Sequence, residues 1–335
     1  MASILVTGAS GFIGSFIVEE ALNKGFDVWA GMRATSSKHY LKDPRIKFFT
    51  SDFSNPTKLT AMLAAHKEQY GKFDIIIHCS GVTKCANKRD FDKINFGQTK
   101  LLVDTLRMLD MVPKQFIYIS TLSIFGAIHE QNYEPITESD TMMPNTAYGL
   151  SKRKSERYLQ NISDFPYIFI RPTGVYGPRE KDYFLMAKSI KQHVDFAVGY
   201  KHQDLTFVYV KDVVNVIFLC IKQEIVRRAY FVTDGGVYSS RSFSDLIQKE
   251  MGCKFVLHIK CPLIILKVVS LLAEMIATMS RKSSTLNSDK YKIMKQRNWR
   301  CDMTPTQEEL GFEPKYNLKR GVAETIAWYK KEGWL

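Results

Sequence analysis

Tyr148 and Lys152, four residues apart, are the side chains of this sequence best placed by type and spacing to do chemistry. They fall at the start of a predicted helix, where a spacing of four puts both on one face. A nearby ammonium favours the phenolate, so we expect Lys152 to lower the pKa of Tyr148 from about 10 towards working pH. Tyr148 would then serve as a general acid or base.

A second chemical signal is the glycine-rich run from Thr7 to Gly14, between the first predicted strand and the first predicted helix. Its glycines are spaced GxxGxxG. The first permits a tight turn, the second lets the backbone approach a pyrophosphate, and the third lets the helix pack close to the sheet. The helix N-terminus then faces the anion. We expect a dinucleotide to bind there through Gly8, Ser10, Gly11, Phe12, Ile13 and Gly14.

The choice between NAD and NADP depends on the residues after the second predicted strand. A carboxylate there bonds the NAD ribose, whereas an arginine accommodates the 2′-phosphate of NADP. Asp27 precedes that strand, at its wrong end, while Arg33 follows it, with hydroxyls and Lys38 close behind. Such groups suit a phosphate monoester. NADP(H) is therefore the preferred cofactor, with NAD(H) as the alternative.

These residues need a scaffold of alternating strands and helices. Short β-branched or aromatic runs alternate with helical patterns, which predicts βαβ units, a parallel sheet and ligand binding beyond the carboxyl ends of the strands. Strands are expected at 3–7, 28–32, 47–50, 73–78, 115–120 and 167–171, and helices at 12–24, 56–70, 91–109 and 147–159.

The expected fold is α/β: a Rossmann-like, doubly wound parallel sheet with a smaller, interleaved C-terminal substrate lobe. No linker separates the two parts. The predicted division gives 1–172, with later returns near 206–250, to the NADP-binding domain, and 173–205 with 251–335 to the substrate lobe.

Taken together, the motifs of this chain resemble those of the extended short-chain dehydrogenases/reductases, the NAD-dependent epimerase/dehydratase family. The resemblance is closest to the branch of the 3β-hydroxysteroid dehydrogenases and dihydroflavonol reductases, and it runs from residue 3 to about 235. It rests on TGASGFIG, Asp52-Phe53, IIHCSG, the Asn95 of INFGQTKLL, ISTLSIFG, YGLSK, IRPTGVYGP and FVYVKDV, in the family's order and spacing.

The resemblance implies a role for each matching residue. Thr121 would hold the substrate oxygen, Tyr148 would pass the proton, and Lys152 would bind the nicotinamide ribose. Asp52 and Phe53 resemble the pair beside the adenine, and Ser80 and Gly81 stand where the family usually has two alanines. His78 is expected to be a buried strand-end residue, and Lys84 is either a ligand contact or a surface lysine.

Within the family, the sequence favours a simple carbonyl reductase. Sugar 4,6-dehydratases typically carry Asp-Glu directly after the catalytic threonine, where this chain has Leu122 and Ser123. Epimerases of the family generally retain NAD and carry a carboxylate after the second strand. A nucleotide-sugar epimerase or reductase with tightly bound NAD remains an alternative, and a non-catalytic dinucleotide-binding regulator is a second one.

The region from 262 to 300 bears on the substrate and the partner. Ten Lys or Arg against two acidic residues between Lys254 and Arg300 supply an excess of eight positive charges within a net charge of +13. The segment 262–279 is apolar apart from a stripe of Lys267, Ser270 and Glu274. Its length and charges argue against a membrane span and fit an interfacial helix, flanked by Arg281, Lys282, Lys290, Lys292 and Lys295. An internal lid helix is the alternative.

The expected substrate is therefore hydrophobic and lipid-like: a 3-ketosphinganine, a 3-ketoceramide or a 3-ketosteroid. Peripheral association with an anionic membrane through 262–300 would fit such a substrate. The basic stretch lacks the regularly placed aromatics that stack nucleic-acid bases, so nucleic acid is not expected as a partner.

Composition sets the remaining expectations. A chain with 45% hydrophobic and 24% charged residues is typical of a soluble globular protein. Its six cysteines are scattered, without a CxxC pair or metal-ligand spacing, as in a reduced cytoplasmic protein that holds no metal. Its first residues do not resemble a secretory signal. The family resemblance implies a homodimer formed through the helices after Asn95 and around Tyr148.

Overall fold

A parallel sheet of seven strands forms the centre of the first of two compact units. The computed structural model describes residues 1–50, 52–279 and 286–335, with side chains in the helix at 263–279 only as far as residue 276. The strand order is β10-β6-β5-β4-β1-β2-β3. The strands are β1 (Ser3–Thr7), β2 (Asp27–Met32), β3 (Lys47–Thr50), β4 (Ile75–His78), β5 (Gln115–Ile119), β6 (Tyr167–Pro172) and β10 (Arg228–Val232).

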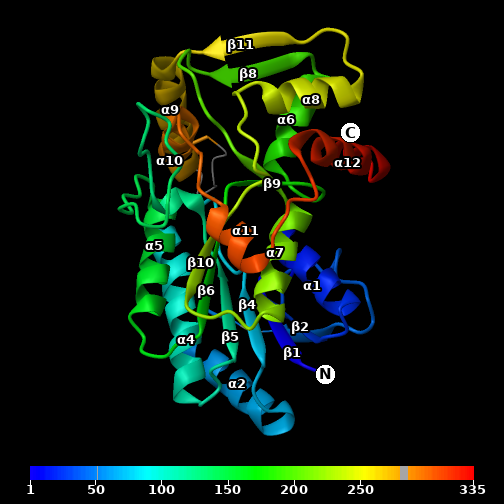
Figure 1. The fold of residues 1–335 in the computed structure, drawn as a ribbon, viewed down its shortest axis with the longest axis vertical. Coiled ribbons are helices and arrows are strands. Elements are labelled where there is room, and N and C mark those ends of the chain that lie inside the picture. Colours follow the sequence, from blue (N-terminus) through cyan, green and yellow to red (C-terminus); the bar gives the residue numbers. More distant parts are fainter. Residues whose placement is uncertain (51, 280–285) are drawn as a thin grey trace. The chain divides into compact units, whose positions relative to one another are not determined.

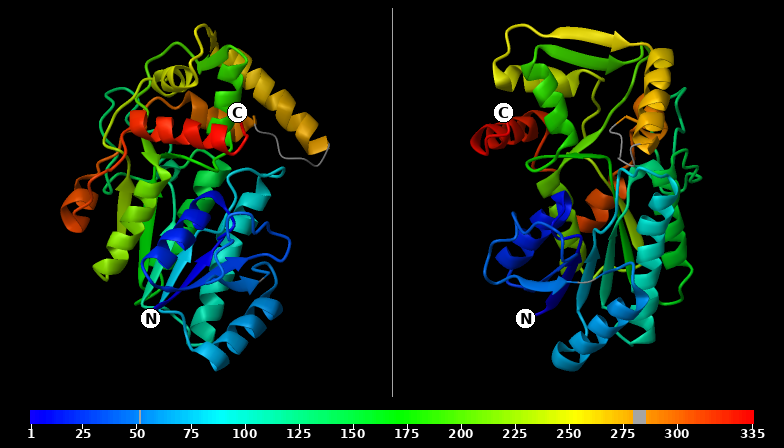
Figure 2. Two further views of the ribbon diagram at one scale, coloured as in Figure 1. Left: turned by 90° about the vertical axis from the view of Figure 1, so that its right-hand side faces the viewer. Right: turned by 180° about the vertical axis from the view of Figure 1, so that it is seen from behind.

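Helices cover both faces of this sheet (Figures 1 and 2). One face carries α1 (Phe12–Asn23) and α7 (Val210–Lys222), and the other carries α2 (Pro56–Tyr70), α4 (Gln98–Met108) and α5 (Ala147–Gln160). A short α3 (Arg89–Phe91) and a π-helical turn (Asp92–Gly97) lead into α4. The predicted Rossmann-like, doubly wound parallel sheet is confirmed.

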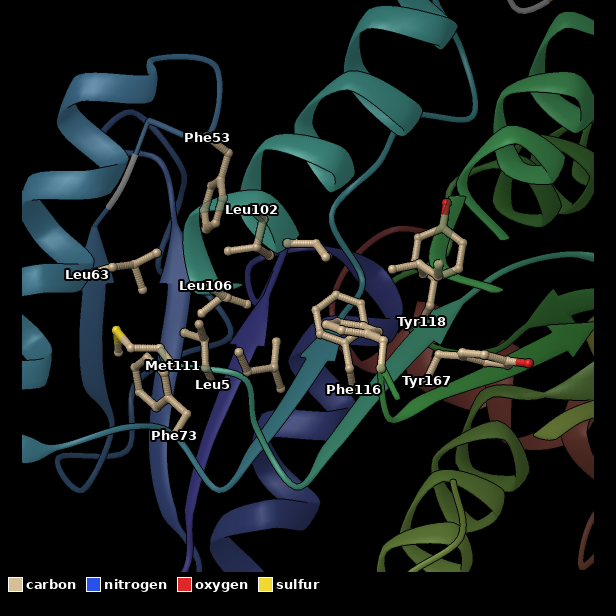
Figure 3. Close-up of a cluster of buried hydrophobic side chains, with 14 of the residues drawn as sticks. Leu5, Phe53, Leu63, Phe73, Leu102, Leu106, Met111, Phe116, Tyr118 and Tyr167 are labelled. Carbon is tan, nitrogen blue, oxygen red and sulfur yellow. The ribbon is translucent and has the colours of Figure 1, made fainter. Parts of the chain in front are cut away.

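The core of this unit is the layer of apolar side chains between the sheet and helices α2 and α4. Leu5 and Phe116 reach it from the strands, Leu63 from α2, and Leu102 and Leu106 from α4, all without exposed surface (Figure 3). Burial of such side chains is worth about 1.5–3 kcal/mol each. It fixes the strands in register, and their carboxyl ends therefore meet at one edge.

The second unit comprises Leu122–Thr146, Pro172–Val213 and Phe231–Leu335. Its aromatic core includes Tyr176, Tyr209 and Phe243. Its strands are β7 (Gly174–Tyr176) paired with β9 (Phe207–Tyr209), and β8 (Val194–Val198) paired with β11 (Leu257–Cys261). Its helices are α6 (Asp182–Lys191), α8 (Ser242–Met251), α9 (Leu263–Met279), α10 (Ser288–Lys295), α11 (Thr304–Leu310) and α12 (Leu318–Lys331). Within the described ranges, no helix has the length and hydropathy to cross a membrane.

Candidate active site

Lys152 is buried on α5, at the carboxyl edge of the sheet. Its Nζ donates a hydrogen bond to the carbonyl oxygen of Ile119, the last residue of β5, at 2.7 Å. The same nitrogen lies 4.5 Å from the centroid of the Tyr118 ring. Burial lowers the pKa of Lys152 from 10.5 to about 8, against the opposing charge of Glu156. Near neutral pH, Lys152 is therefore a mostly charged ammonium held in a largely dry place.

Tyr148 lies one helical turn before Lys152, half-buried, with Thr121 as its hydrogen-bond partner. Burial raises the pKa of Tyr148 to about 12, and the hydrogen bond with Thr121 opposes that rise. The expectation that the pKa of Tyr148 falls towards working pH is wrong for this structure, because desolvation of the phenol outweighs the hydrogen bond with Thr121. Tyr148 is therefore a phenol that carries its proton at neutral pH.

The glycine turn joins β1 to α1 in a conformation that side chains would block. Gly8 has φ +67°, and a Cβ there would lie 2.8 Å from the backbone nitrogen of Ser80. A Cβ on Gly14 would collide with the carbonyl oxygen of Gly8. Gly11, at the N-cap of α1, has no side chain with which to cap the helix, and its own N–H donates to Gly8 at 2.9 Å. The positive end of α1 is therefore open to an anion.

The remaining residues predicted in this turn have different surroundings. Ser10, Phe12 and Ile13 are partly exposed where the turn enters α1. Phe12 packs edge-on against Phe16, with ring centroids 6.2 Å apart. The backbone of this stretch, rather than its side chains, is what the structure offers to a pyrophosphate.

Arg33 follows directly on the last residue of β2 and is exposed. Lys38, also expected near a phosphate, has its Nζ 3.8 Å from the centroid of the Phe48 ring. Asp27 is the first residue of β2 and bonds Lys47 Nζ at 2.9 Å. Of Asp27 and Arg33, it is therefore the positively charged Arg33 that lies at the carboxyl end of β2.

The residues that follow β3 and β4 differ in whether their side chains or only their backbone atoms are accessible to a ligand. Asp52 is exposed, and its carboxylate accepts hydrogen bonds from Ser54, which lower the pKa of Asp52. The side chain of Phe53 is buried in the core, so only its backbone can face a ligand. The Ser80 N–H donates to Thr7 Oγ1 at 3.3 Å, and a Cβ on Gly81 would lie 3.5 Å from Lys152 Nζ.

Asn95 is a positioning residue that the sequence marked only as part of a motif. It is fully buried in the π-helical turn, and its Oδ1 accepts the Val82 N–H at 2.7 Å. Its Nδ2 donates to Val82 O and to Ser151 Oγ. Asn95 thus ties the segment after β4 to the turn of α5 between Tyr148 and Lys152. Its place in a π-helix is the structural signal, since such turns recur at functional sites.

His78 is a buried strand-end residue, as predicted. Its Nδ1 pairs with Thr7 Oγ1 at 2.7 Å and its Nε2 with Thr99 Oγ1 at 2.9 Å. Burial lowers the pKa of His78 to about 3, with a smaller contribution from the Lys152 charge. A neutral imidazole with both nitrogens engaged holds β1, β4 and α4 together.

Lys84, expected to be either a ligand contact or a surface lysine, is partly exposed.

The residues at this edge fit a dinucleotide. At Gly8 and Gly14 the turn leaves no room for a side chain, and the helix behind it offers its positive end. The Lys152 ammonium is held next to the backbone of Gly81. A Tyr–Thr hydrogen bond beside that ammonium can hold and release one proton. Such an arrangement suits proton transfer to a carbonyl oxygen next to a bound cofactor.

Comparison with known proteins gives the same assignment. The sequence profile of the NAD dependent epimerase/dehydratase family matches residues 4–232. A putative UDP-glucose 4-epimerase from Methanocaldococcus jannaschii is 26% identical, with 98% of each chain covered. A sterol-4-alpha-carboxylate 3-dehydrogenase (decarboxylating) from Dictyostelium discoideum is 24% identical over 97% of this chain and 100% of that one. The solved dTDP-glucose 4,6-dehydratase of Bacillus anthracis, in complex with NAD, superposes with a TM-score of 0.77 at 18% identity, covering 100% of this chain and 98% of that one.

Proposed function

Because the chain belongs to the NAD dependent epimerase/dehydratase family, we propose that it is an NADPH-dependent carbonyl reductase acting on a hydrophobic, lipid-like ketone. The observation that carries the proposal is the arrangement of Tyr148, hydrogen-bonded to Thr121, one helical turn before the buried Lys152 at the carboxyl edge of the sheet. A phenol holds its proton at neutral pH and can give it to the ketone oxygen as negative charge develops there.

Thr121, Tyr148 and Lys152 then share the work of the reaction. A nicotinamide cofactor, when bound, supplies the hydride. Thr121 and Tyr148 hold the ketone oxygen between their hydroxyls. As charge develops on that oxygen, Tyr148 Oη gives it a proton, and the Thr121 hydroxyl and the Lys152 charge stabilise the phenolate left behind. Lys152 also binds the nicotinamide ribose, from its fixed position against Ile119.

The preference for NADPH rests on Arg33. We expect Arg33→Asp to shift the ratio of kcat/KM for NADPH over NADH towards NADH by ~10²-fold, because it removes the partner of the 2′-phosphate and offers a ribose acceptor. Lys42→Asp makes a like charge change at another exposed residue between β2 and β3 and should leave the ratio unchanged. A wild-type enzyme that already prefers NADH would overturn the assignment.

A hydrophobic substrate is supported by the sterol dehydrogenase among the relatives and by the apolar surface of α9. The experiment is NADPH oxidation by the purified protein with 3-ketosphinganine, a 3-ketoceramide or a 3-ketosteroid, using Tyr148→Phe as the inactive control. Turnover of at least one of these ketones is expected. No turnover of any of them, together with conversion of a nucleotide sugar, would overturn the proposal.

The second candidate is a nucleotide-sugar epimerase, favoured by the Methanocaldococcus relative. An epimerase regenerates its cofactor in each cycle and therefore consumes none. Incubation with UDP-glucose, followed by separation of the products, distinguishes the two: interconversion of the 4-epimers without net NADPH loss identifies an epimerase, whereas stoichiometric NADPH loss on a ketone identifies a reductase.

We also propose a cytoplasmic location with peripheral binding to an anionic membrane through 262–300. The supporting observation is that α9 turns Leu266 and Ser270 inwards and exposes a broad apolar surface outwards. The exposed residues are Ile264, Ile265, Val268, Val269, Leu271, Leu272, Met275 and Ile276. Ser270 of the predicted polar stripe is thus buried, its Oγ bonded to Leu266 O, while Lys267 is exposed. This exposure favours an interfacial helix over an internal lid.

Two of the basic residues that flank α9 in the sequence are engaged with other groups of the protein. Lys290 pairs with Asp182 at 3.4 Å, and Lys292 Nζ donates to Asn145 O at 2.8 Å. Arg281 and Lys282 lie outside the described residues. Lys295 is exposed and remains a candidate for contact with lipid head groups. The proposed homodimer through α4 and α5 stays a prediction that sedimentation would test.

A further inference from the structure

The strand pair β8–β11 has its apolar face outwards. The parallel register places Leu257 opposite Val194, and Ile259 opposite Phe196. Side chains of paired residues point to the same side of a sheet, and alternate residues share a face. One face of the pair therefore consists of Val194, Phe196, Val198, Leu257, Ile259 and Cys261. Phe196 is 60% exposed, Leu257 51% and Ile259 38%.

The opposite face of the pair is polar and anchored. Asp195 is buried, and its Oδ2 accepts hydrogen bonds from Ser244 Oγ of α8 at 2.8 Å and from His258 Nδ1 at 3.0 Å. Strands β8 and β11 lie side by side over α6 and α8 (Figure 1). The buried carboxylate and its partners fix which face is turned outwards. This orientation is the reverse of the apolar-in, polar-out alternation of a solvated antiparallel sheet.

The strand pair β8–β11 ends beside the start of α9. The N–H of Gly199, just after β8, donates to the carbonyl oxygen of Cys261 at 2.9 Å. A Cβ on Gly199 would lie 3.4 Å from the Leu263 side chain at the start of α9. Figures 1 and 2 show α9 starting beside the carboxyl ends of both strands. Two exposed aromatic side chains, Tyr200 (70%) and Phe255 (67%), lie at the ends of the strands.

We propose that the outer face of β8–β11 and the exposed side of α9 form one continuous docking surface, which inserts into an anionic lipid bilayer. The inference deepens the proposed function, on which it rests for the use of a lipid substrate. Contiguous apolar surface of this kind marks an interaction site, and aromatic residues at its edge suit a membrane interface. The strand pair thus adds a second element to the membrane-binding surface, and both of its strands lie outside the segment 262–300.

Charge selects the bilayer over a second copy of the chain. Lys254, three residues before β11, and Lys267, on α9, are exposed beside the apolar side chains. A two-fold interface through this surface would place the lysines of both copies around one apolar contact, where they repel. An anionic head-group layer instead attracts each of them while the apolar side chains enter the acyl boundary.

The test removes the strand face and leaves α9 intact. The variant carries Phe196→Ser, Leu257→Ser and Ile259→Ser, and its partition onto vesicles of phosphatidylcholine with phosphatidylglycerol is measured by co-sedimentation. We expect at least a ~10²-fold lower partition coefficient than for the wild type, because three large apolar side chains no longer enter the bilayer. Met108→Ser, which removes a 66% exposed apolar side chain from α4, is the matched control and should bind as the wild type does.

A second measurement separates insertion from attraction alone. The fluorescence of the tryptophan in Phe196→Trp should be quenched by brominated acyl chains in anionic vesicles. Lys254→Glu with Lys267→Glu should weaken vesicle binding ~10-fold at low salt, an effect that high salt abolishes. Lys72→Glu, at another exposed lysine, is the control for the charge change. Binding that does not change in the triple serine variant would overturn the proposal.

Two further outcomes bear on the same surface. If the wild type is a dimer that ignores vesicles, and the triple variant is a monomer, the surface is an interface between copies and the proposal is wrong. All variants are also assayed for NADPH oxidation with a short, soluble ketone in the absence of vesicles. Retained activity with lost vesicle binding supports docking, whereas absent wild-type activity refutes the reductase assignment and leaves the vesicle result to stand by itself.

Discussion

Tyr148→Phe is expected to lower kcat for ketone reduction by at least ~10²-fold while leaving NADPH binding and the fold intact. The substitution removes only the hydroxyl that donates the proton. The aromatic ring keeps its edge-on contact with Phe91, at a centroid distance of 6.1 Å. Loss of the hydrogen bond with Thr121 should change the free energy of unfolding by only about 1 kcal/mol.

Tyr158→Phe is the matched control for that variant. Tyr158 lies on the same helix, and its hydroxyl bonds Asp104 far from the Tyr148–Thr121 pair. Turnover by the control should stay within ~2-fold of the wild type, since the partly buried Tyr158 hydroxyl takes no part in proton transfer. Steady-state kinetics measure the change in kcat, and fluorescence titration with NADPH measures cofactor binding. Wild-type turnover in Tyr148→Phe would remove Tyr148 from the mechanism.

The sequence predicted the scaffold closely because its signals are local. The expected strands at 3–7, 47–50 and 115–120 correspond to β1, β3 and β5, and the expected helix at 56–70 has the bounds of α2. The expected helix at 91–109 is interrupted by the π-helical turn, because the side chain of Asn95 bonds Val82 and Ser151, two residues remote in sequence. No periodicity along the chain encodes such a contact.

What the sequence could not predict depends on burial. The pKa of Tyr148 was expected to fall and instead rises to about 12, since the cost of desolvation is set by tertiary packing. The polar stripe on α9 was identified, but not the fact that Ser270 within it is buried. The outward apolar face of β8–β11 cannot be predicted from the sequence, because a short run such as Leu257–Cys261 does not indicate which of its faces the rest of the fold covers.

Lys152 provides the last prediction, in which activity and stability change in opposite directions. Lys152→Met should lower kcat by ~10²-fold or more, because the charge that stabilises the Tyr148 phenolate is lost. It should at the same time raise the free energy of unfolding at about pH 7 by about 1–3 kcal/mol. The fall in the pKa of Lys152 from 10.5 to about 8 corresponds to a net cost of about 3 kcal/mol for keeping this lysine charged in the folded protein, after the favourable charge of Glu156 is included.

The pH dependence identifies the source of that stability. Below about pH 8 both the folded and the unfolded chain hold the proton of Lys152, so the full burial cost is present. Between about 8 and 10.5 the unfolded state binds more protons, and this residue makes the wild type more stable as the pH rises. Urea unfolding should therefore show a gap in the free energy of unfolding between Lys152→Met and wild type that is full up to about pH 8, narrows above it and closes only above about pH 10.5. Lys154→Met, at an exposed lysine of the same helix, should show no such gap. A gap that does not change with pH would mean that packing of the methionine, and not relief of a buried charge, stabilises the variant.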